Sequence, residues 1–285
     1  MNRAEFAMPA DGARLAPVVR WRGGVRSEVD DWISEEVPVA LEFNGVSHAV
    51  MLATPADLED FALGFGLAEG IFANAGDLYG CEVEADARGI TLRLEVSSRS
   101  FAGLKERRRT LAGRTGCGLC GTESLDQVLR PLPCNAAGSF APLHARAVAQ
   151  AMREMRERQH LCEATGAVHA AAWCDRDGRV QWLREDIGRH NALDKLIGAL
   201  ARAGHTARDG FIAVTSRASV EMVHKAAMAG APLLAAVSAP TLLAIDTARA
   251  AGMGLVGLAR HDDLVVYANA ERVVLEAAPK AQEAQ

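Results

Sequence analysis

The feature that most constrains the fold lies in the second half of the chain, where short apolar runs alternate with longer amphipathic ones. The runs "GFIAVTS", "PLLAAVS" and "GLVGLA" have the length and composition of buried strands. The segments between them, "SVEMVHKAAMAG" and "PTLLAIDTARAAG", place apolar residues at helical spacing. Strand and helix in alternation predict a mostly parallel sheet with helices packed on its faces, which is the α/β class.

The segments that flank this alternation extend the same domain. "AVHAAAWC" and "RVQWLRE" predict two strands that form a hairpin across Asp177-Gly178, and "HNALDKLIGALARAG" predicts the helix that follows them. "PLHARAVAQAMREMRERQHL" predicts a long amphipathic helix before the first strand, and "DLVVYA" predicts the last strand. We therefore expect one α/β domain over residues 134–278, with a short tail at 279–285.

The first part of the chain predicts a separate and smaller unit. "VPVALEF" and "VSHAVML" are alternating runs joined by Asn44-Gly45, which is a strong hairpin signal. A helix opens at Pro55, and "CEVEADARGITLRLEVS" supplies two more strands. Residues 31–112 are thus expected to form a β-rich domain with one helix, so that the whole chain is α+β. Residues 1–30 show no clean periodicity and predict a loosely ordered segment.

Composition excludes several classes of function. The net charge of −5 argues against a general nucleic-acid binder. No apolar run is long enough to span a bilayer, and the N-terminus lacks the apolar core of a secretion signal. We expect a cytoplasmic protein with no membrane or nucleic-acid partner. In that compartment its six cysteines are expected to be reduced thiols.

Residues 113–121, "GRTGCGLCG", place Cys117 and Cys120 two residues apart among glycines. Closely spaced glycines predict a mobile loop, and residues 113–133 are expected to hold this loop and a following helix. A basic stretch nearby would favour the nucleophilic thiolate form of the cysteines, although it equally fits a solvated helix face. The basic residues are Lys105, Arg107, Arg108, Arg109 and Arg114.

Three readings of the cysteine pair remain open from the residues alone: half of a zinc site, a redox pair, or a carrier of sulfur. A structural zinc site needs a second pair of ligands, whereas Cys134 and Cys162 have no close cysteine partner. We therefore expect no metal. Zinc deaminases have the signature H-x-E followed by P-C-x-x-C. If His169 is taken as the histidine of this signature, the glutamate position is occupied by Ala171. The cysteine pair also comes before the histidine and not after it, so deaminase chemistry is not expected.

Polar side chains follow three predicted strands, each just before a predicted helix. Because ligands gather at the carboxyl ends of strands in open α/β sheets, and helix N-termini bind anions, these turns predict a site for a phosphate-bearing ligand. The alternative is that Ser219 and Thr241 are only N-caps. The candidates are Ser216, Arg217, Ser219, Ser238, Thr241 and Arg189, with His169 and His190 beside them.

Five motifs together resemble the FdhD family, the formate dehydrogenase accessory sulfurtransferases. In order, they are "AGRTGCGLCG", "TGAVHAAAW", "EDIGRHNALDKLIG", "SRASVEMVHKAAMAG" and "VSAPTLLA". The resemblance implies a cytidine-deaminase-like, three-layer C-terminal domain and a homodimer. It also implies that Cys117 takes persulfide sulfur from a cysteine desulfurase, with Cys120 assisting.

The resemblance further implies that the sulfur passes to molybdenum, or tungsten, in the bis(molybdopterin guanine dinucleotide) cofactor before the cofactor enters formate dehydrogenase. In the family, a loop after the late strand binds this cofactor. That loop corresponds here to Leu258, Ala259, Arg260, His261, Asp262 and Asp263, and "RHDD" is more acidic than related sequences at this place. The alternative function is a chaperone that binds the molybdenum cofactor without catalysis.

Overall fold

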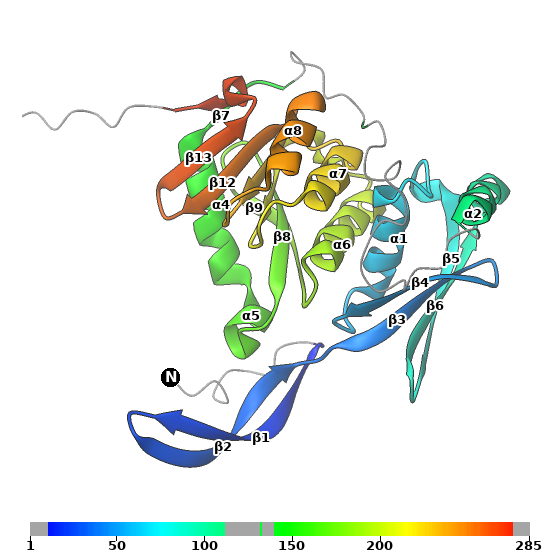
Figure 1. Cartoon of the computed structure of the whole chain (residues 1–285), viewed down its shortest axis with the longest axis horizontal. Helices are drawn as coiled ribbons and strands as arrows, with labels where there is room; N and C mark the ends of the chain where they lie inside the picture. The colour runs from blue at the N-terminus through cyan, green and yellow to red at the C-terminus, as the bar shows by residue number, and fades with distance from the viewer. Residues whose placement is uncertain (1–10, 112–131, 133–139, 276–285) are drawn as a thin grey trace, which may run out of the picture.

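The computed structural model describes residues 11–111, 132 and 140–275, which form two packed units and an N-terminal arm (Figure 1). The larger unit is built on a six-stranded sheet in the order β13-β12-β11-β10-β8-β9. Its strands are β8 (His169–Cys174), β9 (Val180–Asp186), β10 (Phe211–Val214), β11 (Leu233–Ala236), β12 (Gly254–Arg260) and β13 (Asp263–Ala268).

Only the centre of this sheet is parallel. β10, β11 and β12 are parallel neighbours, whereas β8 is antiparallel to both β9 and β10, and β13 is antiparallel to β12. The prediction of a mostly parallel sheet was therefore wrong. The reason is that short connections, such as the turn at Gly178 with φ of 83°, reverse the chain at both sides of the sheet.

Helices cover both faces of the sheet, so the larger unit has the three layers expected of it. One face carries α6 (Arg189–Arg202), α7 (Val220–Met228) and α8 (Leu242–Ala250), with Leu193, Leu196 and Met222 in the core between them and the strands. The other face carries α4 (Ala145–Arg158), which buries Val148 and Met155. The short helix α5 (His160–Thr165) leads from α4 into β8.

Short elements complete the larger unit. β7 (Leu143–His144) pairs in parallel with β14 (Val273–Val274), which brings the end of the described chain back to the start of α4. Two single-turn helices, η3 (Ala207–Asp209) and η4 (Ala270–Arg272), precede β10 and β14.

The smaller unit is a four-stranded sheet in the order β4-β3-β6-β5, with two helices. Its strands are β3 (Val37–Phe43), β4 (Val46–Ala53), β5 (Leu78–Asp86) and β6 (Gly89–Val96), and η2 (Ala75–Asp77) precedes β5. Asn44 and Gly45 both have positive φ, as the predicted hairpin requires. The expected helix is α1 (Leu58–Ala68), but α2 (Ser98–Leu111) is a second one that the sequence reading missed. The run of basic residues hides the apolar spacing of this helix, which buries Leu104 in the core of the smaller unit.

The N-terminal segment is more ordered than expected. Strands β1 (Ala13–Arg22) and β2 (Val25–Ser34) form a regular antiparallel hairpin that projects from the body (Figure 1). The prediction of a loosely ordered segment was wrong for this part. Trp32 is the only large apolar residue of the hairpin that is buried. Because neither face of the hairpin packs into a core, its sequence lacks the alternation of apolar and polar residues by which a strand is recognised.

The two units meet where α1 crosses α6 with the two backbones in contact. A Cβ atom added to Gly64 would overlap the carbonyl oxygen of Asp194, and one added to Gly198 would overlap that of Asp60. Buried ion pairs lie on both sides of the crossing. Asp60 pairs with Arg184 and Arg202, and Lys225 pairs with Asp194 and Glu69.

Among the helices that the structure describes, none is long and apolar enough to cross a membrane.

We predict that Gly64→Ala lowers the free energy of unfolding by about 1–3 kcal/mol, because the new methyl group must push the two helix backbones apart. Gly103→Ala in α2 is the matched control, since an added Cβ there meets nothing within 4 Å. That change should stabilise the protein by up to about 1 kcal/mol. Urea titrations of both variants measure the difference. Equal stability of the two variants would show that the helices are not in close contact.

Candidate functional site

The topology of the large sheet gathers the predicted site residues at one edge. β10, β11 and β12 run in the same direction, and β9 does so too because both it and β10 are antiparallel to β8. Their carboxyl ends therefore share an edge, at which β8 also begins. The segments brought there are His169, Arg189, Ser216–Ser219, Ser238–Thr241 and 258–263.

Backbone hydrogen bonds join these segments into one continuous surface. The Ser238 amide donates to the Ser216 carbonyl at 3.4 Å, and the Leu258 amide donates to the Ser238 carbonyl at 3.3 Å. The Thr241 amide donates to the Ala218 carbonyl at 3.1 Å. The turns after β10, β11 and β12 thus lie in succession along the edge.

Three helices begin at this edge, so their free backbone N–H groups face it. Thr241 is the N-cap of α8, and its hydroxyl accepts from the Ala244 amide at 3.3 Å. This residue therefore has the N-cap role that the sequence offered as the alternative to ligand binding. Ser219 occupies the same position in α7 and is buried, but its side chain does not cap the helix. The Ser216 hydroxyl donates to the Arg217 carbonyl at 3.0 Å.

Arg189 and His190, the first two residues of α6, have buried polar atoms without hydrogen bonds to the described residues, as does Ser219 at the start of α7. Arg189 Nε and His190 Nε2 are buried and make no hydrogen bond to the described residues. His190 Nε2 lies 4.0 Å from the carboxylate oxygen Oε2 of Glu221. Buried polar atoms of this kind indicate a place where a ligand would supply the missing partner.

Both histidines at the edge are held in the neutral form. Burial, aided by the positive charges of Arg189 and Lys225, lowers the pKa of His190 to about 4. Burial and the Arg189 charge also lower the pKa of His169. The positive charge facing a ligand here therefore comes from arginine, and the imidazoles can act only as neutral hydrogen-bonding groups.

The segment 258–263 forms an irregular end to the β12–β13 hairpin. Leu258 and His261 have φ of 52° and 55°, and the pairing register shifts between Gly257 and Arg260. Arg260 Nε donates to the Val237 carbonyl at 3.0 Å. The side chain of Ala259 is buried against the α4 face of the sheet, so only its backbone could meet a ligand.

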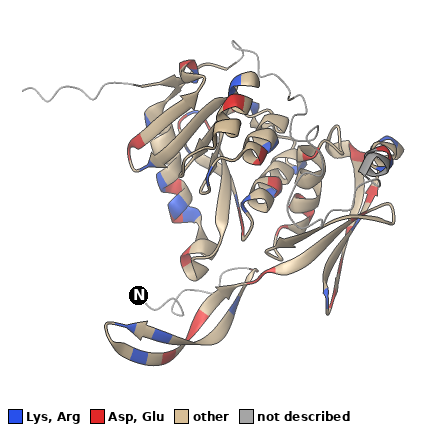
Figure 2. Cartoon of the chain, in the orientation of Figure 1, with Lys and Arg blue, Asp and Glu red and all other residues tan. Residues whose placement is uncertain are grey.

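The acidic character of this segment is partly neutralised. Arg153 on α4 forms an ion pair with Asp262 at 2.7 Å. α4 also carries Arg146, Arg156 and Arg158, and Figure 2 shows that basic residues recur along this helix. The carboxylate of Asp262, one of the two in "RHDD", is thereby paired with an arginine of the neighbouring helix.

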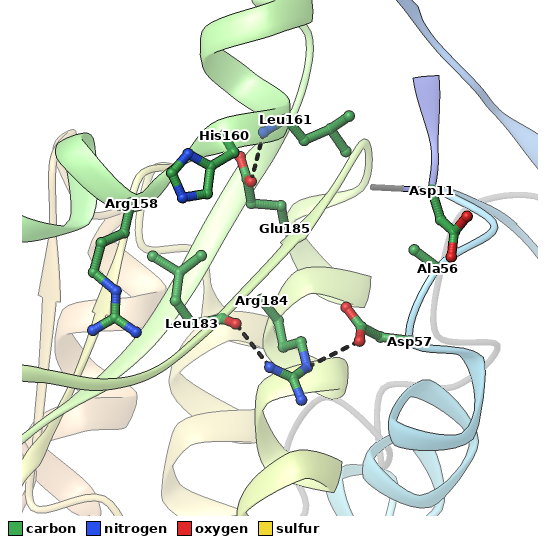
Figure 3. Close-up of a pocket in the computed structure, with 9 residues that line it drawn as sticks. All are labelled: Asp11, Ala56, Asp57, Arg158, His160, Leu161, Leu183, Arg184 and Glu185. Carbon is green, nitrogen blue, oxygen red and sulfur yellow. Dashed lines mark hydrogen bonds and ion pairs between the residues drawn. The ribbon is translucent and has the colours of Figure 1, made fainter. Parts of the chain in front are cut away.

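A separate polar cavity of about 360 Å³ lies along the outer strand β9 (Figure 3). Several of its charged groups are already engaged: Arg184 pairs with Asp57, and the Glu185 carboxylate accepts from the amides of Leu161 and Cys162. Burial raises the pKa of Glu185. No predicted site residue that the structure describes lines this cavity. Its lining residues are Asp11, Ala56, Asp57, Arg158, His160, Leu161, Leu183, Arg184 and Glu185.

Cys117 and Cys120, the predicted sulfur-handling residues, lie outside the described part of the chain. The cysteines within it are Cys81, Cys162 and Cys174, all free thiols. Burial raises the pKa of Cys81 to about 11 and also raises that of Cys174, so both stay protonated at neutral pH. The described residues contain no group of three or more histidine, cysteine or carboxylate side chains that could hold a metal ion.

Sequence reasoning missed the charged residues buried directly behind the edge. Asp186, Asp194 and Lys195 are each at most 1% exposed, although they lie in or beside a helix whose apolar pattern gave no sign of them. The only signal was the density of polar residues in "EDIGRHNALDK".

We predict that acid destabilises the protein through His190. Between pH 6.5 and about 4 an unfolded chain protonates this histidine while the folded protein does not, so stability is lost as the pH falls through this window. The loss amounts to about 3 kcal/mol. It is measured as the difference in free energy of unfolding between wild type and His190→Gln at pH 7 and pH 4. Parallel pH profiles for the two proteins would contradict a buried neutral His190.

Comparison with known proteins places the chain. Residues 34–274 match the sequence model of the FdhD/NarQ family. The chain is 56% identical to the "Sulfur carrier protein FdhD" of Variovorax paradoxus, over 96% of this chain and 98% of that one. It is 55% identical to the protein of the same name from Cupriavidus necator, over 91% and 90% of the two chains.

The fold is also found among solved structures. A crystal structure from Desulfotalea psychrophila, provisionally described as a formate dehydrogenase accessory protein, superimposes with a TM-score of 0.71. The match covers 92% of this chain and all of the other at 23% identity, which shows a common fold. With a family match over most of its length and relatives more than half identical, this chain belongs to the FdhD/NarQ family.

Proposed function

We propose that this protein is a sulfurtransferase that carries sulfur on Cys117 and delivers it to a molybdenum cofactor bound at the sheet edge. The names of its relatives support the first part, since proteins more than half identical to it are called sulfur carriers. The order of the five motifs, with the cysteine pair in its glycine-rich loop, supports the assignment of the carrier residue.

The observation that carries the second part is the pair of buried nitrogen atoms at the start of α6 without hydrogen bonds to the described residues. The bis(molybdopterin guanine dinucleotide) cofactor bears phosphate groups, and phosphate oxygens accept charge-assisted hydrogen bonds from arginine. Arg189 Nε and His190 Nε2 are buried without hydrogen bonds to the described residues, and three helix N-termini add their dipoles. These residues fit an anionic ligand of that kind.

The remaining edge residues would orient the cofactor. Leu242 is 73% exposed and Leu258 is 37% exposed, so both offer apolar surface beside the polar turns. The Arg217 side chain adds positive charge after β10. The cofactor itself supplies the metal that accepts the sulfur, and the protein's part is to bind it by its phosphates and hold it at the edge.

The first chemical step is an exchange between thiols. The Cys117 thiolate attacks the outer sulfur of a persulfide on a cysteine desulfurase, a new S–S bond forms, and the desulfurase cysteine leaves as thiolate. No net oxidation or reduction occurs. Leu132 follows the cysteines in sequence and packs against the core that includes α6, α7 and α8. At this residue the chain therefore lies against the larger unit, which also carries the proposed cofactor site.

The proposal includes formate dehydrogenase as the final recipient and a homodimer as the working form. A cofactor-binding chaperone without catalysis is the second candidate, because the edge alone would serve it. The two candidates differ in one respect, which is whether a persulfide forms on the protein.

We predict that incubation with a cysteine desulfurase and cysteine adds about 32 Da to the intact protein, reversibly by reductant. Cys117→Ala should abolish the gain, because the nucleophilic thiolate is lost. Cys81→Ser is the matched control and should load normally, since the Cys81 thiol is protonated at neutral pH. If wild type gains no mass while the desulfurase is shown to be active, the protein is the cofactor-binding chaperone and not a sulfurtransferase.

We predict that Arg189→Gln weakens the binding of guanosine diphosphate, used as a probe of the dinucleotide, by about tenfold or more. The reason is the loss of one charge-assisted hydrogen bond to phosphate. Arg176→Gln is the control, since Arg176 lies at the β8–β9 turn on the opposite edge of the sheet. Calorimetric titration gives both dissociation constants. Equal affinities of the two variants for guanosine diphosphate would show that the start of α6 does not bind phosphate.

A further inference from the structure

Asp186, the last residue of β9, has a completely buried carboxylate that receives four donors. Oδ1 accepts from the Gly188 amide at 2.7 Å and from Asn191 Nδ2 at 3.0 Å. Oδ2 accepts from the Thr54 amide at 3.0 Å and pairs with Lys195 Nζ at 2.6 Å. One carboxylate therefore joins the β9–α6 turn, helix α6 and the end of β4.

The chain after β4 holds the same turn from the other side. The Thr54 hydroxyl accepts from the Ile187 amide at 3.0 Å, and the Thr54 carbonyl accepts from Lys195 Nζ at 3.0 Å. Asn191 Nδ2 also donates to the Leu52 carbonyl at 2.8 Å. The smaller unit is thus hydrogen-bonded directly to the turn between β9 and α6.

This turn sets the position of Arg189 and His190, which follow it. Arg189 Nε and His190 Nε2 make no hydrogen bond within the described part of the chain, so no partner there fixes these two atoms. A Cβ atom added to Gly188 would lie 2.8 Å from Asn191 Nδ2, which shows how closely the turn is enclosed. The direction in which the two side chains leave α6 depends on this backbone.

Stability alone gives a weak reason for an ion pair at this place. Asp186 and Lys195 both have side chains that are 0% exposed, and burying two charges costs much of what their attraction returns. Apolar residues of similar volume would often stabilise a core as well. What an apolar pair cannot do is receive two backbone amides and a side-chain amide at fixed angles.

We infer that Asp186, together with Lys195 and Thr54, is a positioning residue of the ligand site: its carboxylate fixes the β9–α6 turn and thereby the placement of Arg189 and His190. The inference rests on the proposed function in one respect, namely that these two residues meet the ligand. It adds that the smaller unit takes part in building the site through the chain at Leu52–Thr54.

The test uses the full-length double variant Asp186→Asn/Lys195→Met, in which no buried charge is left unpaired. Backbone amide exchange at Ile187 and Gly188 should accelerate at least tenfold, whereas exchange in β10 stays as in wild type. Guanosine diphosphate should bind at least tenfold more weakly. Thr54→Val, which removes one uncharged acceptor and keeps the volume, should change the exchange at Ile187 in the same direction.

Asp60→Asn is the matched control. It weakens another buried set of ion pairs at the same interface, with Arg184 and Arg202, but leaves the turn untouched. Its nucleotide affinity and its exchange at Ile187 and Gly188 should stay within twofold of wild type even where its melting temperature falls. Unchanged exchange at the turn in the double variant would overturn the inference, as would an equal loss of affinity in Asp60→Asn at equal stability. If wild type binds no nucleotide, the proposed cofactor site fails, and the exchange measurement still decides whether Asp186 holds the turn.

Discussion

The contact between α1 and α6 is the interaction on which the rest of the structure depends. Gly64 and Gly198 let the two helix backbones touch, and the buried ion pairs of Asp60 and Lys225 lie beside that contact. Because α1 belongs to the smaller unit and α6 to the larger one, this crossing fixes how the two units sit. It also places the end of β4 against the turn from which α6 begins.

The consequence for the site is electrostatic. The start of α6 lies in a poorly hydrated region, and burial beside the Arg189 guanidinium lowers the pKa of both His190 on α6 and His169 on β8, so the two imidazoles are neutral. Lys195 and Lys225 are each paired with a buried carboxylate behind the edge. The proposed phosphate site at this edge therefore has the positive charges of Arg189 and Arg217, two neutral imidazoles and the N-termini of three helices.

The proposed sulfur carrier and the proposed cofactor site lie in different parts of this chain. The proposed carrier, Cys117, sits in a glycine-rich segment outside the described residues, whereas the proposed cofactor site is built on strand ends and helix starts. A carrier has to meet a donor and an acceptor in turn, which favours a loop. A large anionic cofactor has to be held in one orientation, which favours rigid elements and explains why so much buried polar structure supports them.

The sequence by itself determined the strands of the six-stranded and four-stranded sheets, the helices α4, α6, α7 and α8, the Asn44-Gly45 hairpin and the family, because these depend on local periodicity, turn residues and motif order. It also identified the polar turns after β9, β10 and β11. It also predicted the β8–β9 hairpin, but it failed for α2, for the exposed β1–β2 hairpin and for the antiparallel pairings of β8 with β10 and of β12 with β13, where no local pattern records what packs against what. Only the tertiary structure decided that the polar turns share one edge, that Ala259 faces inward, and that Asp186, Lys195 and Thr54 hold the start of α6. Those residues come from distant parts of the chain, and their charges become informative only when burial removes them from water.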